Sequence, residues 1–245
     1  MFLKKVRYLR EEVPATEIYP FNIPALQTFE ELEIPSNVTF FVGENGSGKS
    51  TLLEAIADIS GFHTAGGNRN HLYDVHSAQS DLAEYIKLSW SLKVTKGFFL
   101  RAETFYQFAS HLDLMENAPG KYDAYGGKSL HKQSHGEAFL SLFKNAFGQR
   151  SIFLLDEPEA ALSPTRQLSL MRIIKELEED AQFIIATHSP ILLGYPDATI
   201  YQFDEGAIEQ IRYEDTMHYI VTKRFLDAKE RVFEELFRDF EDSTK

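Results

Sequence analysis

The sequence predicts an α/β fold in which a mostly parallel β-sheet is flanked by helices. Short apolar runs alternate along the chain with helix-forming segments, the pattern expected of strand–helix–strand units. A glycine-rich loop lies between one apolar run and the helix after it. An acidic pair and a histidine directly follow two later apolar runs, and open parallel sheets bind ligands at the carboxyl ends of their strands.

The elements of the first half follow from local composition. Apolar, aromatic and β-branched clusters predict strands over 2–9, 32–34, 38–42 and 97–101. Pro14, Pro20 and Pro24 exclude long regular structure between the first two. Good helix formers predict a helix over 52–57 that ends near Gly61, and further helices over 81–90 and 103–115. The polar, glycine-containing segment 61–80 is expected to be an exposed loop.

The second half continues the alternation after an irregular stretch at 118–134. Aromatic residues at helical spacing predict a helix over 136–148, which packs into the core. Strands are expected over 151–155 and 183–186 and around Ile200 and Ile208, with an amphipathic helix over 166–178 and a long charged helix or helix pair over 216–242. Strands that alternate with helices in this way form a mostly parallel sheet.

The composition is that of an ordinary soluble globular protein, with 43% hydrophobic and 25% charged residues. A formal net charge of −12 argues against avid, non-specific nucleic-acid binding, although a local basic groove is compatible with it. The chain has no cysteine, which excludes disulfides, cysteine-type zinc sites and thiol catalysis. No apolar run approaches the roughly 18 residues that span a bilayer, and residues 1–7 are too charged for a signal peptide. A cytoplasmic location is expected.

The loop G-E-N-G-S-G-K-S-T matches the phosphate-binding pattern G-x-x-x-x-G-K-[S/T]. It lies between a predicted strand and a predicted helix, which is the context that the motif requires. Its glycines allow successive N–H groups to point at an anion, and the helix N-terminus adds partial positive charge. The nucleotide-binding residues are therefore Gly43, Glu44, Asn45, Gly46, Ser47, Gly48, Lys49, Ser50 and Thr51. Lys49 is expected to reach the β- and γ-phosphates of ATP, and Ser50 to ligate Mg²⁺.

Two later strand ends supply the remaining chemistry. Asp156 and Glu157 follow the strand 151–155, so Asp156 is expected to hold Mg²⁺ through water and Glu157 to polarise the attacking water. His188 follows the strand 183–186, where its imidazole is expected to reach the γ-phosphate. Lys49, Glu157 and His188 are thus the predicted catalytic residues of an ATPase.

These motifs together resemble the ATP-binding-cassette (ABC) ATPase superfamily, and the resemblance covers nearly the whole chain. Residues 133–137 read Q-S-H-G-E and resemble the family signature L-S-G-G-Q, with Ser134 and Gly136 retained. In the family this signature binds the γ-phosphate held by the opposite subunit. The segment after Glu157 resembles the family D-loop, with Ser163 in place of its aspartate. The resemblance implies a single domain over 1–245 that contains a small helical lobe at about 101–148.

The glutamine loop of the family has the weakest counterpart. Glu103, Arg101 or Gln107 can take the place of its glutamine, and we prefer Glu103 because a carboxylate can ligate Mg²⁺. Tyr8, Tyr19 and Phe21 are candidates for the aromatic platform under adenine, and each is equally compatible with a core position.

The resemblance implies that ATP joins two copies head to tail and that hydrolysis lets the dimer open. The form D-E-P-E at 156–159 and the short segment between Arg101 and Ser134 favour a soluble ATPase that acts on a partner protein or nucleic acid. The alternatives are the ATP-binding subunit of a membrane transporter and a nucleotide switch with little turnover. Residues 61–80 and 118–133 are candidate partner surfaces, and surface loops without function are the equal alternative.

Overall fold

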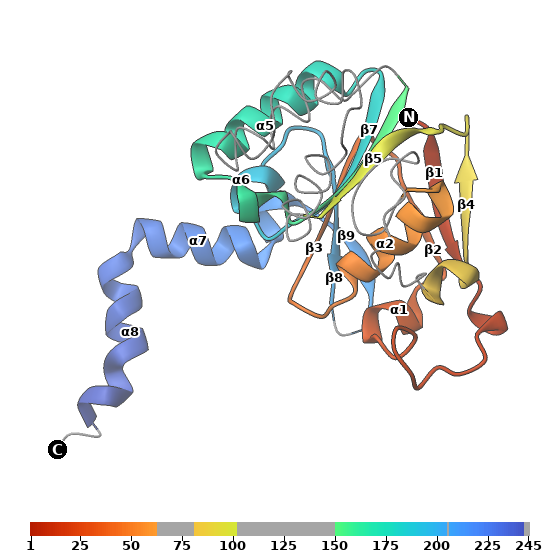
Figure 1. Cartoon of the computed structure of the whole chain (residues 1–245). Coiled ribbons are helices and arrows are strands. Elements are labelled where there is room, and N and C mark those ends of the chain that lie inside the picture. The colour runs from red at the N-terminus through yellow and green to blue at the C-terminus, as the bar shows by residue number, and fades with distance from the viewer. Residues whose placement is uncertain (63–80, 102–149, 205, 243–245) are drawn as a thin grey trace, which may run out of the picture.

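Two β-sheets with helices between and beside them form the part of the chain that the structure describes. The structure is a computed structural model, and it describes residues 1–62, 81–101, 150–204 and 206–242. The larger sheet has six strands in the order β5–β6–β7–β3–β8–β9 (Figure 1). Their bounds are β3 Val38–Gly43, β5 Lys96–Arg101, β6 Ser151–Asp156, β7 Ala181–Ala186, β8 Thr199–Phe203 and β9 Ile208–Ile211.

All neighbouring strands of this sheet are parallel except β8 and β9, which form an antiparallel pair at one edge. Every residue of β3, β6 and β7 is buried, as expected for strands that are covered on both faces and are apolar throughout. The sequence prediction of a mostly parallel sheet is confirmed.

The smaller sheet is antiparallel, in the order β2–β1–β4. Its strands are β1 Leu3–Tyr8, β2 Glu31–Glu33 and β4 Ile86–Trp90. Helix α2, Lys49–Ser60, lies between the two sheets and contacts β4 on one side and β3, β6 and β7 on the other (Figure 1). The apolar face of α2, which includes Leu53 and Ile56, shares one core cluster with both sheets.

The prediction of a helix over 81–90 is wrong. Residues Asp81–Tyr85 form a short 3-10 helix, and the rest is strand β4. In β4 the side chain of Ile86 is buried while the neighbouring Lys87 is exposed, and the strand pairs with β1 along its length. Pairing with an already formed strand outweighs the moderate helix propensity of this segment.

Four more helices cover or extend the six-stranded sheet. Helices α5, Pro164–Leu177, and α6, Pro190–Leu193, pack on the face of the sheet opposite α2 (Figure 1). Their buried side chains form a second core cluster with that face of the sheet. Helices α7, Met217–Asp227, and α8, Lys229–Asp242, form the helix pair expected over 216–242 and project from the body (Figure 1). Short elements complete the described chain: α1 Pro24–Thr28 and 3-10 helices Arg10–Glu12, Pro158–Ala161 and Tyr213–Asp215.

None of the helices among the described residues is long and apolar enough to cross a membrane. Among the described residues, most of the large exposed apolar side chains lie on α7 and α8: Met217, Ile220, Val221, Phe225, Leu226, Phe233, Leu236 and Phe237. The predicted helices over 103–115 and 136–148 and the loop over 61–80 fall largely or wholly outside the described residues.

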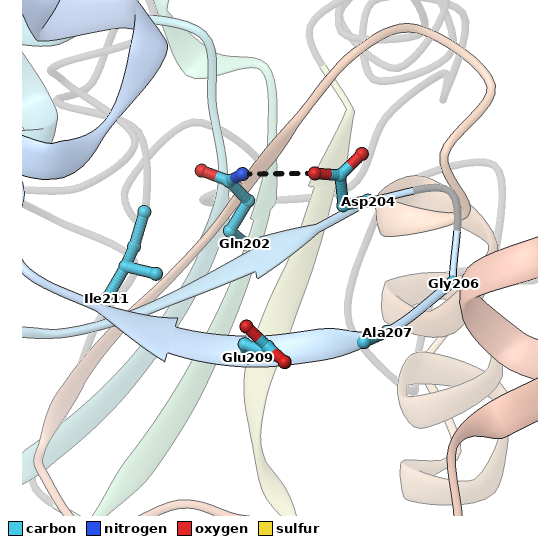
Figure 2. Close-up of a pocket in the computed structure, with 6 residues that line it drawn as sticks. All are labelled: Gln202, Asp204, Gly206, Ala207, Glu209 and Ile211. Carbon is cyan, nitrogen blue, oxygen red and sulfur yellow. Dashed lines mark hydrogen bonds between the residues drawn. The ribbon is translucent and has the colours of Figure 1, made fainter.

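The β8–β9 hairpin carries a pocket of about 350 Å³ at the edge of the sheet (Figure 2). Its described lining consists of Gln202, Asp204, Gly206, Ala207, Glu209 and Ile211. Gln202 Nε2 donates to Asp204 Oδ2 at 3.5 Å. This lining contains two carboxylates and no cation, so it does not suit a phosphate group.

Candidate functional site

The phosphate loop leaves β3 at Gly43 and enters α2 at Lys49, as the sequence predicts. Gly46 and Gly48 have φ values of 81° and 101°, in the left-handed region that a side chain disfavours. Lys49 is buried, and its Nζ donates to the carbonyl oxygens of Gly43 and Glu44, both at 2.8 Å. Burial lowers the pKa of Lys49, while the carboxylates of Glu157 and Asp156 oppose that shift.

Asp156 ends β6 directly beside the first turn of α2. The Ser50 hydroxyl donates to Asp156 Oδ1 at 2.8 Å, and Arg101 Nε donates to Asp156 Oδ2 at 2.9 Å. These residues and Glu157 line a pocket of about 170 Å³. A hydroxyl and a carboxylate in contact form the all-oxygen donor set that Mg²⁺ prefers, and phosphate oxygens and water commonly complete its octahedron. Ser50 and Asp156 therefore fit the predicted magnesium site.

Arg101 joins two carboxylates at the edge of this pocket. It ion-pairs with Glu54 on α2 as well as with Asp156. Burial raises the pKa of Glu54, and the Arg101 guanidinium partly reverses that effect. The glutamine-loop position considered for Arg101 thus holds a cation that compensates the negative charges of Glu54 and Asp156. The preferred candidate for that loop, Glu103, lies outside the described residues, as does Gln107.

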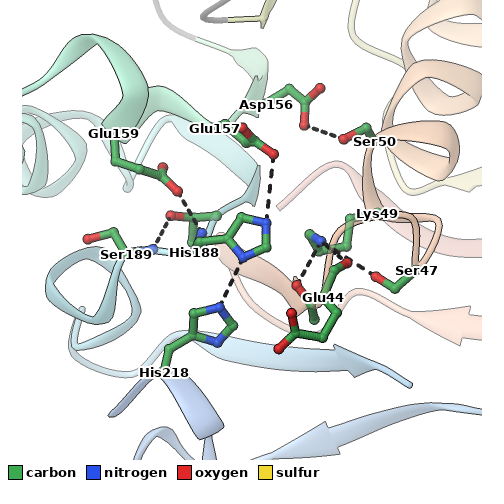
Figure 3. A network of polar contacts seen from close by, with 12 residues as sticks. Glu44, Ser47, Lys49, Ser50, Asp156, Glu157, Glu159, His188, Ser189 and His218 are labelled. Carbon is green, nitrogen blue, oxygen red and sulfur yellow. Dashed lines mark hydrogen bonds and ion pairs between the residues drawn. The ribbon is translucent and has the colours of Figure 1, made fainter. Parts of the chain in front are cut away.

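Glu157 and His188 face each other beside the phosphate loop (Figure 3). Glu157 has a left-handed backbone, with φ 50° and ψ 52°, and its N–H donates to the carbonyl oxygen of Ala186 at 2.9 Å. This conformation turns the chain away from β6. His188 Nε2 lies 3.7 Å from Glu157 Oε1. The predicted base and the predicted histidine are therefore neighbours, as the placement of both at strand ends implied.

The backbone at His188 is held by side chains on both sides. Glu159 Oε1 accepts the His188 N–H at 2.6 Å. Ser189 caps α6, because its Oγ accepts from the N–H groups of Ile191 and Leu192, both at 3.2 Å. The Ser189 hydroxyl also donates to Gln167 Oε1 on α5 at 2.5 Å. These hydrogen bonds hold the backbone after β7 in place and so position the His188 side chain.

One further histidine, His218 on α7, contacts the site, and the sequence analysis did not single it out. His188 Nδ1 and His218 Nε2 are 3.0 Å apart (Figure 3). Burial lowers the pKa of His188, and Lys49 and His218 lower it further; burial also lowers the pKa of His218. Both rings are therefore neutral near pH 7. No motif joins two residues 30 positions apart, so only the fold reveals this pair.

The three aromatic candidates for adenine binding separate clearly. Tyr8 and Phe21 are buried, where Tyr8 stacks on Phe29 and Phe21 meets Tyr85 edge-on. Tyr19 is 65% exposed, and its hydroxyl lies 3.3 Å from Thr51 Oγ1 at the phosphate loop. The signature residues Ser134 and Gly136 lie outside the described residues.

A protein-family model matches the part of the chain that carries these residues. The model described as "AAA domain, putative AbiEii toxin, Type IV TA system" matches residues 38–108 and 129–194, more than half of the chain. The matched residues include the phosphate loop, Asp156, Glu157 and His188.

Curated relatives share part of the sequence. "Phosphate import ATP-binding protein PstB" from Colwellia psychrerythraea is 27% identical over 211 residues, which cover 76% of this chain and 74% of the relative. "Putative ABC transporter ATP-binding protein" from Sulfurisphaera tokodaii is 25% identical over 207 residues, which also cover 76% of this chain. The chain spans only 41% of the length of the Sulfurisphaera relative.

Among solved structures, one described as "An inward-facing conformation of a putative metal-chelate type ABC transporter" aligns with a TM-score of 0.51 and 14% identity. The alignment covers 91% of this chain and 88% of that one. At this identity the likeness shows the fold alone, which is that of the ABC ATPases.

Proposed function

Because this chain belongs to the AAA-domain family of ABC-type P-loop ATPases, we propose that it hydrolyses ATP with Mg²⁺ and couples turnover to a change in association. The observation that carries the proposal is the convergence of groups from separate strand ends at one phosphate loop. Ser50 contacts Asp156 at 2.8 Å, and Glu157 faces His188 at 3.7 Å. A phosphate loop needs these partners to hydrolyse a nucleotide, and not merely to bind it.

The residues of the loop bind and orient the triphosphate. Backbone N–H groups between Gly43 and Lys49 form an anion cradle, and the N-terminus of α2 favours negative charge there. Lys49 Nζ, which rests on two carbonyl oxygens, exchanges these contacts for phosphate oxygens. Ser50 and Asp156 hold the Mg²⁺, which supplies charge neutralisation at the phosphates when bound. Glu103 is proposed as a further metal-contacting group.

Glu157 and His188 act on the water and the phosphoryl group. Glu157 accepts a proton as the water oxygen bonds to the γ-phosphorus and the bond to the β-phosphate oxygen breaks, giving ADP and phosphate. His188 donates a hydrogen bond from Nε2 to a γ-phosphate oxygen. Tyr19, the exposed member of the three aromatic candidates, stacks on adenine.

The site of one copy is completed by a second copy. Ser134 and Gly136 of the signature are proposed to bind the γ-phosphate held by the other chain, so that two nucleotides lie between two subunits. The single domain over 1–245, its helical lobe at about 101–148 and a cytoplasmic location are part of the same proposal. ATP thus favours the closed dimer, and loss of the γ-phosphate favours the open one.

The proposed recipient of this motion is a partner protein or a nucleic acid. The D-E-P-E form at 156–159 and the short segment before Ser134 support this reading. The second candidate is the ATP-binding subunit of a membrane transporter, which is favoured by the similarity to the phosphate import ATP-binding protein of Colwellia. Stimulation of turnover by DNA or by a membrane component separates the two.

The test is steady-state ATPase activity of the wild type and Glu157→Gln, with and without double-stranded DNA. Removal of the general base is expected to lower kcat by about 10²-fold or more. Glu209→Gln on the exposed strand β9 is the matched control and is expected to retain wild-type turnover. Equal turnover in the wild type and Glu157→Gln, or none in the wild type with Mg²⁺, contradicts the proposal.

A further inference from the structure

We propose that His218 is a positioning residue that fixes the tautomer of His188, so that His188 Nε2 carries its proton toward the reacting phosphate. This inference rests on the proposed function. The two rings are 5.1 Å apart between centroids and inclined by 50°, with His188 Nδ1 and His218 Nε2 at 3.0 Å (Figure 3). His218 lies beyond residue 194, outside the stretch that the family model matches.

The surroundings of His188 Nε2 decide which nitrogen carries the hydrogen. This atom is buried and has no hydrogen-bond partner among the described residues. The carboxylate oxygen Glu157 Oε1, an acceptor, lies 3.7 Å from it. A γ-phosphate oxygen is also an acceptor. A lone pair on Nε2 would face these acceptors, so Nε2 must be the N–H nitrogen of a neutral ring.

The tautomer of His218 follows from that of His188. With the hydrogen on Nε2, His188 Nδ1 offers only a lone pair, so the short contact at 3.0 Å requires His218 Nε2–H as the donor. The reverse arrangement, with His188 Nδ1–H donating, leaves Nε2 unable to donate to phosphate. A histidine that acts through one ring nitrogen commonly has its tautomer set by a bond to the other.

His218 is held in register with His188 by contacts that join their two segments. The buried side chain of Thr216 caps α7, accepting from Tyr219 N at 3.2 Å, and so fixes the first turn that carries His218. The Tyr213 hydroxyl donates to the carbonyl oxygen of Pro190 at 2.8 Å, two residues after His188. These hydrogen bonds therefore connect the segments that carry the two histidines, β7 with α6 and the first turn of α7.

The decisive variants are His218→Gln and His218→Leu. The amide nitrogen of glutamine can donate to His188 Nδ1 as histidine does, whereas leucine cannot. We expect His218→Leu to lower kcat about fivefold to tenfold, the rate effect of a lost hydrogen bond, with little change in KM for ATP. His218→Gln is expected to restore most of kcat. Val221→Ala, exposed on the same helix, is the control and should match the wild type.

A second measurement, made without nucleotide, tests the tautomer of His188 independently of ATP turnover. Nitrogen NMR of ¹⁵N-histidine-labelled full-length protein near pH 8, with His188 assigned by His188→Gln, distinguishes protonated from unprotonated ring nitrogens. We expect a protonated Nε2 and an unprotonated Nδ1 on His188 in the wild type and in His218→Gln, and a mixture in His218→Leu.

A protonated Nδ1 on His188 in the wild type, or the same tautomer in His218→Leu as in the wild type, overturns the inference. Equal losses of kcat in the glutamine and leucine variants overturn it too. Absence of ATP turnover in the wild type refutes the proposed function instead, and the NMR result still decides the role of His218.

Discussion

At the scale of single residues, the site keeps carboxyl groups in places where water is scarce. Glu159 accepts the backbone N–H of His188 at 2.6 Å, and burial raises the pKa of its carboxyl group, against which that hydrogen bond works. A carboxyl whose folded pKa lies above its unfolded value binds more protons in the folded state. The free energy of unfolding therefore falls as pH rises from the unfolded value to the folded one.

Replacing Glu159 by glutamine is expected to raise the midpoint of thermal unfolding at about pH 8, because the neutral amide removes the cost of the buried charge. Glutamine Oε1 can still accept from His188. As the pH falls below about 3, where Glu159 is protonated in both states, the difference between the variant and the wild type should vanish. Scanning calorimetry across this range checks it, and a difference that does not change with pH rules the explanation out.

Motifs predicted the chemistry-bearing residues, because Asp156, Glu157 and His188 follow apolar strands and Ser50 follows the glycine loop. Ser50, Asp156, Glu157 and His188 come together as their positions implied. Contacts between distant segments were not predictable, since no local pattern encodes them. His218 and the bridge from Arg101 to Glu54 are of this kind. For adenine, burial separates Tyr19 from Tyr8 and Phe21, and the sequence alone could not do so.

At the scale of elements, the junction of β3 with the phosphate loop depends on the absence of a side chain at Gly43. Its φ is 153°, and a Cβ there would lie 2.3 Å from the carbonyl oxygen of Phe203 on β8. This carbonyl oxygen belongs to the backbone of β8, which cannot move away without breaking the hydrogen bonds between β3 and β8. The close approach of β3 to β8 therefore requires a glycine at this position.

Gly43→Ala is expected to lower the free energy of unfolding by about 2 kcal/mol or more, through overpacking and an unfavourable φ. Gly206→Ala in the β8–β9 turn is the matched control, because a Cβ there meets nothing within 4 Å. Urea unfolding of both variants measures the effect. Equal free energies of unfolding for the two variants would show that β3 and β8 can accommodate a Cβ at position 43 without loss of stability.

Elements whose own residues form a clear hydrophobic pattern were predictable from the sequence. Strands that depend on pairing with a distant segment were not. The continuous apolar runs at β3, β6 and β7 identified buried parallel strands. The segment 81–90 contains good helix formers, yet its second half pairs with β1 as strand β4. The partner strand lies far away in sequence, so a local reading could not anticipate that outcome.

At the scale of the whole molecule, one buried amide joins the two sheets. Gln182 on β7 is fully buried, and its Oε1 accepts from the N–H groups of Phe2 and Leu3 at 3.0 and 2.8 Å. Its Nε2 donates to the carbonyl oxygen of Leu3 at 2.9 Å. The start of β1 is thereby fixed to the six-stranded sheet, and α2 is enclosed between the sheets.

Gln182→Leu is expected to lower the free energy of unfolding by roughly 2–4 kcal/mol, because two backbone donors and one acceptor lose their buried partner. Gln210→Leu, exposed on β9, serves as the control. Denaturant unfolding compares the two, and a Gln182→Leu protein as stable as this control would mean that water replaces the amide. No local pattern predicts this link, since polar residues in strands more often face solvent.

An ATPase site that closes between two copies should change the mass of the Glu157→Gln protein in solution when ATP binds. Light scattering after size exclusion should give one chain per particle without nucleotide and two chains with Mg²⁺ and ATP, because the trapped γ-phosphate holds the dimer closed. Lys49→Ala should stay at one chain in both conditions. A Glu157→Gln protein that binds ATP yet stays at one chain per particle would rule out a site that closes between two copies.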